Sequence, residues 1–234
     1  MNSETATSTA TSERIQVAML AWLRPDAPAA LARFRQEAAP LWQKYDLRVE
    51  RTLTSVGKGQ LVGTNPHEMP DTMQVISLPS LAAFQAYASD PDYLRLAQVR
   101  DAHLRRMTAT IGTPLDVSSL RPSSVSDPLK RVYGVAFIRF KPGGADGFAE
   151  FNRRAAALFA RHGMHIESMF DVVKTVTPVG ESLPEFAPER VAVFFLDDPS
   201  ALPGYATDPE YKGLAPLRDR GLIAYDFFLG KVPE

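Results

Sequence analysis

The chain has 234 residues, is 45% hydrophobic, carries a formal net charge of −1 and contains no cysteine. This length suffices for two small domains, and the near-neutral charge argues against nucleic acid or a membrane surface as a partner. The absence of cysteine excludes disulfides and thiolate chemistry, and we expect a cytoplasmic protein. Residues 1–13 are rich in Ser, Thr and Ala without an apolar core, which predicts a disordered tail rather than a secretory signal.

The first half of the chain alternates strand-like and helix-like segments. The apolar run Ile15–Leu23 has the length of a strand and ends at a proline-containing turn. The segment that follows has apolar residues at helical spacing, which predicts an amphipathic helix. In chain order we expect a strand at 15–23, a helix at 29–45, a strand at 47–54, a loop at 57–71, a strand at 72–78, a helix from 80 to 104 interrupted at 90–91, and a strand at 107–111.

The second half repeats the first. Residues 72–116 align without a gap with residues 190–234, and residues 15–53 align with 132–170. Two copies at so long a period indicate a duplicated domain rather than a solenoid. We therefore expect strands at 132–140, 165–172, 190–196 and 223–229, helices at 145–162 and within 200–222, and a loop at 180–189.

The order β-α-β-β-α-β in each copy is that of the ferredoxin-like unit. Its antiparallel sheet has helices on one face, so the other face needs a partner. The predicted fold class is α+β: two tandem ferredoxin-like units whose sheets face each other as a pseudo-twofold α+β barrel. The predicted divisions are a tail (1–13), a first repeat (14–116), a linker (117–130) and a second repeat (131–234). A monomer is sufficient for such a barrel, although a homodimer is possible.

Strand alternation places one set of polar residues between the two sheets. Residues two apart on a strand share a face, so Glu50 lies with Arg48 and Thr52, and Glu167 lies with His165. We expect Val49, Arg51 and Leu53, like Phe170 in the second repeat, to pack under the helices. The predicted catalytic residues are His165, Glu167, Glu50 and Arg139, and the predicted substrate-binding residues are Trp22, Tyr133, Tyr87, Tyr205 and Asp226.

Two interpretations of this polar set remain open. It forms either a buried acid–base site, in which Glu167 and His165 share a proton and Arg139 binds an oxyanion, or a satisfied polar layer that fixes the register of the sheets. Asp90 and Asp208 each precede Pro and are expected to cap the following helix. The four scattered His residues make a metal site improbable. The loops 57–71 and 176–189 are candidate lids, with Met69 and Phe186 nearest a ligand.

The segment around the helix interruption carries a resemblance to a known superfamily. Tyr87 with Asp90-Pro91-Asp92-Tyr93 and Arg100 is repeated as Tyr205, Asp208-Pro209-Glu210-Tyr211 and Arg218. This pattern resembles the dimeric α+β barrel superfamily, and within it a small family of uncharacterised function. The resemblance implies the predicted fold and a range of chemistries: heme-degrading and cofactor-free monooxygenases, polyketide cyclases, isomerases, and proteins without known chemistry.

Two differences from relatives argue against two of these chemistries, the polyketide cyclase reaction and a heme site in both repeats. Polyketide cyclases of the superfamily pair a Tyr, matched here by Tyr87 and Tyr205, with a His, and Tyr93 and Tyr211 stand at the His positions. Heme-degrading relatives use a His on a helix. His103 is on the second helix of the first repeat, but its equivalent is Gly221.

Three functional hypotheses follow. The first is a cofactor-independent cyclase, isomerase or monooxygenase that acts on a small aromatic or polyketide-like molecule in a barrel pocket lined by Trp22, Phe137, Phe194, Phe227 and Phe228. The second is a non-catalytic small-molecule-binding or stress-response protein, and the third is an interaction module. In several relatives the cavity lies between sheet and helices, in which case Tyr87, His103 and Tyr205 replace the interior set.

Overall fold

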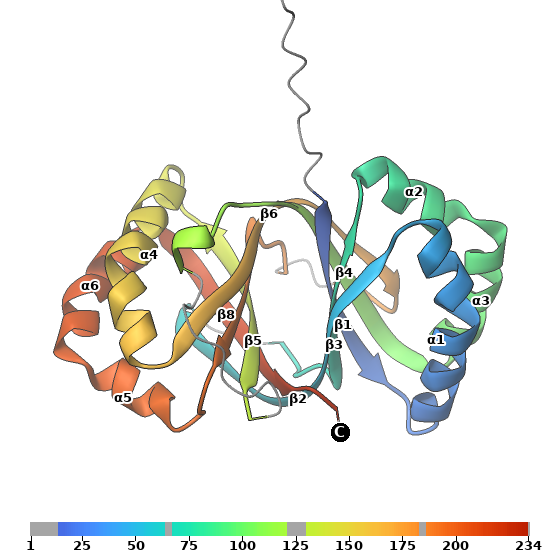
Figure 1. Cartoon of the computed structure of the whole chain (residues 1–234), viewed down its shortest axis with the longest axis horizontal. Coiled ribbons are helices and arrows are strands. Elements are labelled where there is room, and N and C mark those ends of the chain that lie inside the picture. The colour runs from blue at the N-terminus through green and yellow to red at the C-terminus, as the bar shows by residue number, and fades with distance from the viewer. Residues whose placement is uncertain (1–13, 64–66, 121–129, 183–185, 234) are drawn as a thin grey trace, which may run out of the picture.

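The computed structural model describes residues 14–63, 67–120, 130–182 and 186–233, and the expected tail lies outside them. Within these residues eight strands form one closed barrel, with three helices on either side (Figure 1). The first repeat contains β1 (Ile15–Leu23), α1 (Ala27–Lys44), β2 (Arg48–Val62), β3 (Thr72–Leu78), α2 (Leu81–Ser89), α3 (Pro91–Ala102) and β4 (Leu104–Pro114). After a short 3-10 turn, η1 (Ser118–Leu120), the second repeat contains β5 (Val132–Phe140), α4 (Gly144–Arg161), β6 (Met164–Val179), β7 (Arg190–Leu196), α5 (Ala201–Thr207), α6 (Pro209–Arg220) and β8 (Leu222–Lys231).

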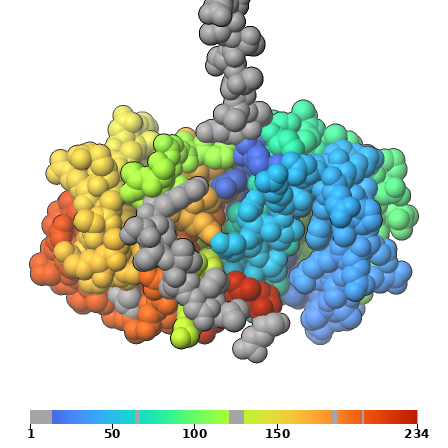
Figure 2. Space-filling view, in the orientation of Figure 1, coloured from blue at the N-terminus to red at the C-terminus, as the bar shows by residue number. Residues whose placement is uncertain are grey.

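The barrel consists of two antiparallel four-stranded sheets joined at both edges. One sheet has the order β4-β1-β3-β2 and the other β6-β7-β5-β8, and β2 pairs with β8 while β4 pairs with β6. The predicted α+β class and its two facing sheets are confirmed. The two repeats make up opposite halves of the molecule, blue to green and yellow to red in Figure 2. Every described helix is too short or too polar to cross a membrane.

Strands β2 and β6 differ from the sequence prediction in their length and in which of their side chains point into the barrel. Residues 57–62 and 176–179, expected in loops, continue these strands along the edges that join the repeats. A β-bulge at Glu50 shifts the register of β2 against β3, and a second at Glu167 shifts β6 against β7. Since one extra residue moves the following side chains to the opposite face, Leu53 and Phe170 lie inside the barrel and not under the helices.

The central strands β1, β3, β5 and β7 are largely buried on both faces, which explains why they are mostly apolar, whereas β2 and β6 are more exposed. The inner faces meet in the barrel core, where Trp22, Leu53, Tyr133, Phe170 and Phe228 are at most 1% exposed. Two further cores fill the space between the outer faces and the helices. The core of the first repeat includes Val17, Leu41, Ile76, Tyr87, Leu96 and Ile111, and that of the second includes Ile138, Phe148, Phe151, Phe159, Phe194, Tyr205 and Phe227.

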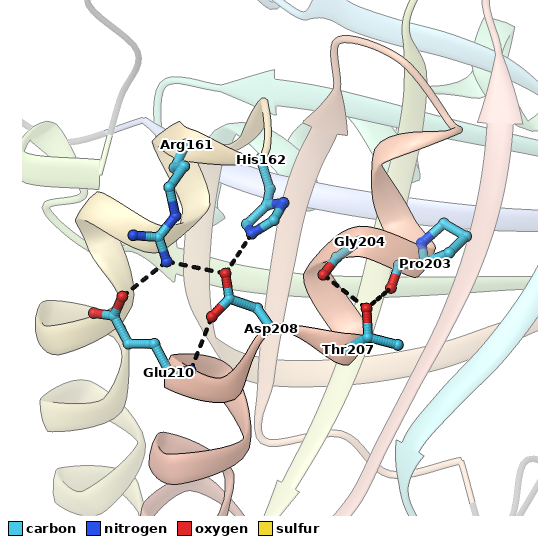
Figure 3. Close-up of polar contacts among 7 residues, drawn as sticks. All are labelled: Arg161, His162, Pro203, Gly204, Thr207, Asp208 and Glu210. Atoms are coloured by element: carbon cyan, nitrogen blue, oxygen red, sulfur yellow. Dashed lines mark hydrogen bonds and ion pairs between the residues drawn. The ribbon is translucent and has the colours of Figure 1, made fainter.

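The helix interruption in each repeat is fixed by a capping aspartate, as predicted. Asp90 accepts a hydrogen bond from the backbone N–H of Asp92, and Asp208 accepts one from Glu210, so each caps the helix that follows. In the second repeat Asp208 also binds His162 and Arg161 at the end of α4 (Figure 3). The hydrogen bond from His162, together with the helix cap and Arg161, lowers the pKa of Asp208 to about 2.

Truncation of Phe170 tests the placement of this residue inside the barrel. Phe170→Ala leaves a cavity in a closed core, and we expect a loss of about 3–5 kcal/mol in the free energy of unfolding, measured by urea denaturation. Val173→Ala is the matched control, because Val173 lies on the same strand and is 58% exposed. Similar losses for the two variants would contradict the inward orientation of Phe170.

The Asp208 carboxylate predicts an acid-sensitive contribution to stability. A lowered pKa means that the charged form stabilises the fold above the ordinary value of 3.8 and that this stabilisation is lost as pH falls through about 2. Asp208→Asn keeps a capping side chain but loses the charge, so we expect a melting temperature lower by about 2 °C at pH 7. Circular dichroism melts should show this difference vanish towards pH 2. A difference independent of pH would exclude the charge as its source.

Candidate functional site

The barrel interior, where the sequence analysis placed a pocket, is a packed core. Trp22, Phe137 and Phe228 lie within it as expected, whereas Phe194 and Phe227 point outward into the core beneath the helices. Phe186, a predicted lid residue, is 6% exposed and packs on Phe137 with ring centroids 4.7 Å apart. The interior aromatic side chains therefore pack against one another.

His165, Glu167 and Glu50 lie towards one end of the barrel, whereas Arg139 lies towards the other. Glu167 forms an ion pair with Arg51, while His165 Nε2 lies 2.8 Å from Asp197 Oδ2, so the two residues have different partners. Arg51 also lies over the ring of Tyr133 on β5. Burial raises the pKa of Glu167, and Arg51 acts against this rise.

Glu50 lies close enough to Glu167 for its charge to help raise the pKa of Glu167, whereas Arg139 and Asp226 lie elsewhere. Glu50 is exposed and accepts a hydrogen bond from the Ser77 hydroxyl at 2.6 Å. Arg139 is six residues from Tyr133 along β5, a separation of about 20 Å, and its charge, more than that of Lys58, favours the ionised form of Asp226. Burial raises the pKa of Asp226, whose Oδ1 has no hydrogen-bond partner among the described residues. Arg139 therefore lies far from the end of β5 that holds Tyr133, Arg51 and the ion pair to Glu167.

A large cavity lies outside the barrel, between the sheet of the first repeat and helices α1–α3. Its volume is about 550 Å³, which falls in the range of small-molecule sites. Tyr87 from the predicted set lines it. Much of the wall is apolar, formed by Met19, Leu31, Phe34, Trp42, Leu47, Ile76, Phe84, Ala97, Met107 and Ala109. Strand β6 of the second repeat completes the wall with Lys174, Val176 and Pro178, so the cavity depends on both halves of the chain.

Hydrogen-bond donors gather at one side of this cavity. Tyr87 accepts a hydrogen bond from Trp42 Nε1 at 3.3 Å and packs against Tyr93 in a tilted arrangement, with ring centroids 4.4 Å apart. Arg100, 6% exposed, donates from Nη1 to the Tyr93 hydroxyl at 3.2 Å and from Nε to Asp101 at 2.7 Å. The Tyr87 hydroxyl hydrogen and Arg100 Nη2 have no acceptor among the described residues, so both can bind a ligand oxygen.

The protonation states of these groups suit them to donate. Burial, reinforced by neighbouring Tyr93, raises the pKa of Tyr87 above its ordinary value, so its hydroxyl stays protonated at neutral pH. Burial opposes the charge on Arg100, but Tyr93 and Asp101 together raise its pKa. The arrangement therefore favours an oxyanion or a carbonyl oxygen over a cation.

The corresponding space in the second repeat is nearly filled. It keeps Tyr205, Tyr211 and Arg218, with Arg218 bonded to Tyr211 and Asp219, but its volume is about 90 Å³. Larger side chains occupy the positions that alignment matches to the open cavity. They are Met169 for Thr52, Phe148 for Leu31, Tyr225 for Met107, Phe227 for Ala109 and Phe194 for Ile76.

Two cross-strand pairs explain this difference. Phe227 on β8 faces Gly59 on β2, and a Cβ at Gly59 would collide with the phenyl ring. The matching pair in the first repeat is Ala109 with Val176. A second pair differs in the same way. Phe194 faces Gly134 in the second repeat, and the matching residues of the first repeat are Ile76 and Val17. Comparison of aligned positions could have found these exchanges in the sequence, whereas single-strand patterns could not.

The histidines lie outside this cavity. His103 caps the end of α3, and its Nδ1 lies 2.9 Å from Asp26 Oδ2. It is not among the residues that line the cavity, so the alternative set of Tyr87, His103 and Tyr205 is not assembled in one place. The described residues contain no group of three or more His, Asp or Glu placed to hold a metal ion.

Comparison with solved structures supports the fold and leaves the activity open. No family model and no curated protein matches the chain. An anthrone oxidase-like protein has a TM-score of 0.58 at 12% identity over 95% of this chain and 92% of its own. A chlorite dismutase variant from Candidatus Nitrospira defluvii has a TM-score of 0.58 at 11% identity over 94% and 91%. A proposed monooxygenase from Fusobacterium nucleatum has a TM-score of 0.56 at 9% identity over 95% and 94%.

The chain shares the closed α+β barrel fold of these neighbours. Each of these neighbours matches nearly the whole chain, so both repeats take part in the similarity. At sequence identities this low, the similarity shows a shared architecture but not a shared chemistry.

The pair Ala109 and Val176 provides a test of why the first cavity is open. Ala109→Phe overpacks against Val176 and should cost about 1–3 kcal/mol in the free energy of unfolding. Val176→Gly should also destabilise, since it removes packing from a strand. The double variant restores the Gly–Phe pairing of the second repeat, so its loss should be smaller than the sum by about 1 kcal/mol or more. Additive losses in a urea-unfolding mutant cycle would contradict the steric coupling.

Proposed function

We propose that the protein is a monooxygenase-type enzyme that binds a small aromatic, polyketide-like molecule in the first-repeat cavity and requires no cofactor. The observation that carries this proposal is the combination of an apolar cavity of about 550 Å³ with two converging donors, Tyr87 and Arg100. The structural neighbours include proteins named for monooxygenase and anthrone oxidase activity, which supports this reaction class.

The donors suit a substrate that reacts as an enolate or a phenolate. An acidic enol ionises without a strong base, and the Tyr87 hydroxyl with the Arg100 guanidinium stabilises the resulting oxyanion. The carbanion form then adds to molecular oxygen, so that its electron pair makes the new C–O bond and a proton completes a hydroperoxide. Loss of water from the hydroperoxide converts the original CH₂ to a carbonyl, and O₂ supplies both the inserted oxygen and the water.

Anthrone is a suitable probe, because its CH₂ lies beside a carbonyl that can enolise. We expect the protein to accelerate oxygen uptake and formation of the quinone product, followed with an oxygen electrode and by absorbance. Tyr87→Phe removes one oxyanion donor and should lower kcat by about 10²-fold or more. Tyr205→Phe is the matched control, since this residue has the equivalent position in the filled second repeat.

Two results would contradict the proposal. One is an uptake rate equal to that of buffer alone with anthrone and with related enolisable ketones. The other is an equal effect of the two tyrosine substitutions, which would place the reaction elsewhere or make the loss one of stability. Melting temperatures of the variants separate these last two causes.

Binding without chemistry is the second candidate, and one observation favours it. Asp101, the one carboxylate among the described lining residues, is hydrogen-bonded to Arg100 and so is already engaged. A protein with this role would bind the same aromatic ligands, and Tyr87→Phe would weaken their affinity, without any oxygen consumption. Binding and turnover measured on one preparation therefore separate the two functions.

A further inference from the structure

We infer that the ligand of the first-repeat cavity carries a negatively charged group, recognised by Arg35 and Lys174. The inference rests on the proposed ligand site and adds its chemical preference. Both residues line the cavity while their side chains are exposed, which places them where the cavity meets solvent. They come from α1 and from β6, so one cation belongs to each repeat.

The charges that line the cavity are unbalanced. Arg35 and Lys174 have no ion-pair or hydrogen-bond partner among the described residues. Buried Arg100 adds a third cation, and Asp101, its partner, is the one described carboxylate in the lining. An anionic group near either residue, where the cavity meets solvent, therefore meets an unpaired cation, while a cationic group would meet repulsion.

Neither outer cation has a cationic counterpart at the position that alignment matches to it in the other repeat. Arg35 aligns with Asn152, which lines the small space of the second repeat. Lys174 pairs with Ile111 across β6 and β4, and the matching pair across β2 and β8 is Gly57 with Leu229. Arg100, in contrast, is kept as Arg218. The two cations thus accompany the open cavity, whereas the buried arginine occurs in both repeats.

The expected ligand is therefore amphipathic. A flat apolar body fits the wall of aromatic and aliphatic side chains, and a carboxylate or a similar acidic group lies where the cavity meets solvent, near Arg35 or Lys174. Exposed cations add little affinity each, so their main effect is on selectivity and on association. An aromatic acid is the substrate class that matches this distribution of charge.

Two dyes of nearly equal shape test this preference. 8-Anilinonaphthalene-1-sulfonate carries one negative charge, and N-phenyl-1-naphthylamine is its neutral counterpart without the sulfonate. We expect the full-length protein to bind the sulfonate more tightly, by about 2–5-fold for each exposed cation, in fluorescence titrations. Added salt should reduce this preference through screening and leave the neutral dye unaffected.

Substitutions assign the preference to named residues. Arg35→Gln and Lys174→Gln should each lower the affinity for the sulfonate by about 2–5-fold and leave that for the neutral dye unchanged. Lys212→Gln on α6 makes the same change in net charge away from the cavity and should change neither affinity. The Ala109→Phe/Val176→Gly variant should abolish binding of both dyes.

The outcomes that overturn the inference are distinct. Equal affinities for the two dyes, or a preference that survives both Gln substitutions, would exclude recognition by Arg35 and Lys174 while leaving the cavity as a ligand site. Sulfonate binding that persists in the filled variant would place the dye elsewhere and exclude the inference as well. Failure of both dyes to bind would overturn the ligand site itself, and with it the proposed function.

Discussion

The pairing of β2 with β8 and of β4 with β6 is the constraint on which the rest of the structure depends. A four-stranded sheet with helices on one face leaves an apolar face and two open edges exposed to water. Closure of the barrel buries both inner faces against each other and satisfies all four edges. Because the enclosed space is then filled by side chains such as Trp22 and Phe228, the large cavity lies outside the barrel, between the sheet of the first repeat and its helices.

The sequence predicted those elements whose signals are local. The ends of β1, β3, β5 and β7 agree with the prediction, because each is a short apolar run bounded by turn residues. The strand at Gly57–Val62 was missed, since its glycines and Lys58 indicate a loop, and it is a strand only because β8 pairs with it. The bulges at Glu50 and Glu167 likewise have no local signal. Because the predicted inward–outward alternation of side chains ignored these bulges, it assigned Leu53 and Phe170 to the wrong face of their strands.

The candidate site was predictable in part for the same reason. The repeated Tyr87 and Arg100 motif was recognisable, as was the option of a cavity between sheet and helices. The repeat that holds the cavity was not predictable, because the cavity volume depends on pairs such as Ala109 with Val176, whose members are far apart in the chain. The proposed interior site relied on His165 and Glu167 sharing a proton, whereas each is bound to a different partner. Contacts between residues far apart in the chain therefore decide both outcomes.

Duplication within one chain allows the two sites to differ, which identical subunits cannot do. An open apolar cavity loses the packing that would otherwise fill it, so it reduces stability where it occurs. In this barrel the second repeat keeps the Tyr–Arg arrangement but packs its space with Phe227, Phe194 and Met169. It also supplies β6 to the wall of the first cavity. The filled repeat thus acts as a well-packed scaffold that compensates for the open one, and the side chains of the open repeat are left to determine which ligand binds.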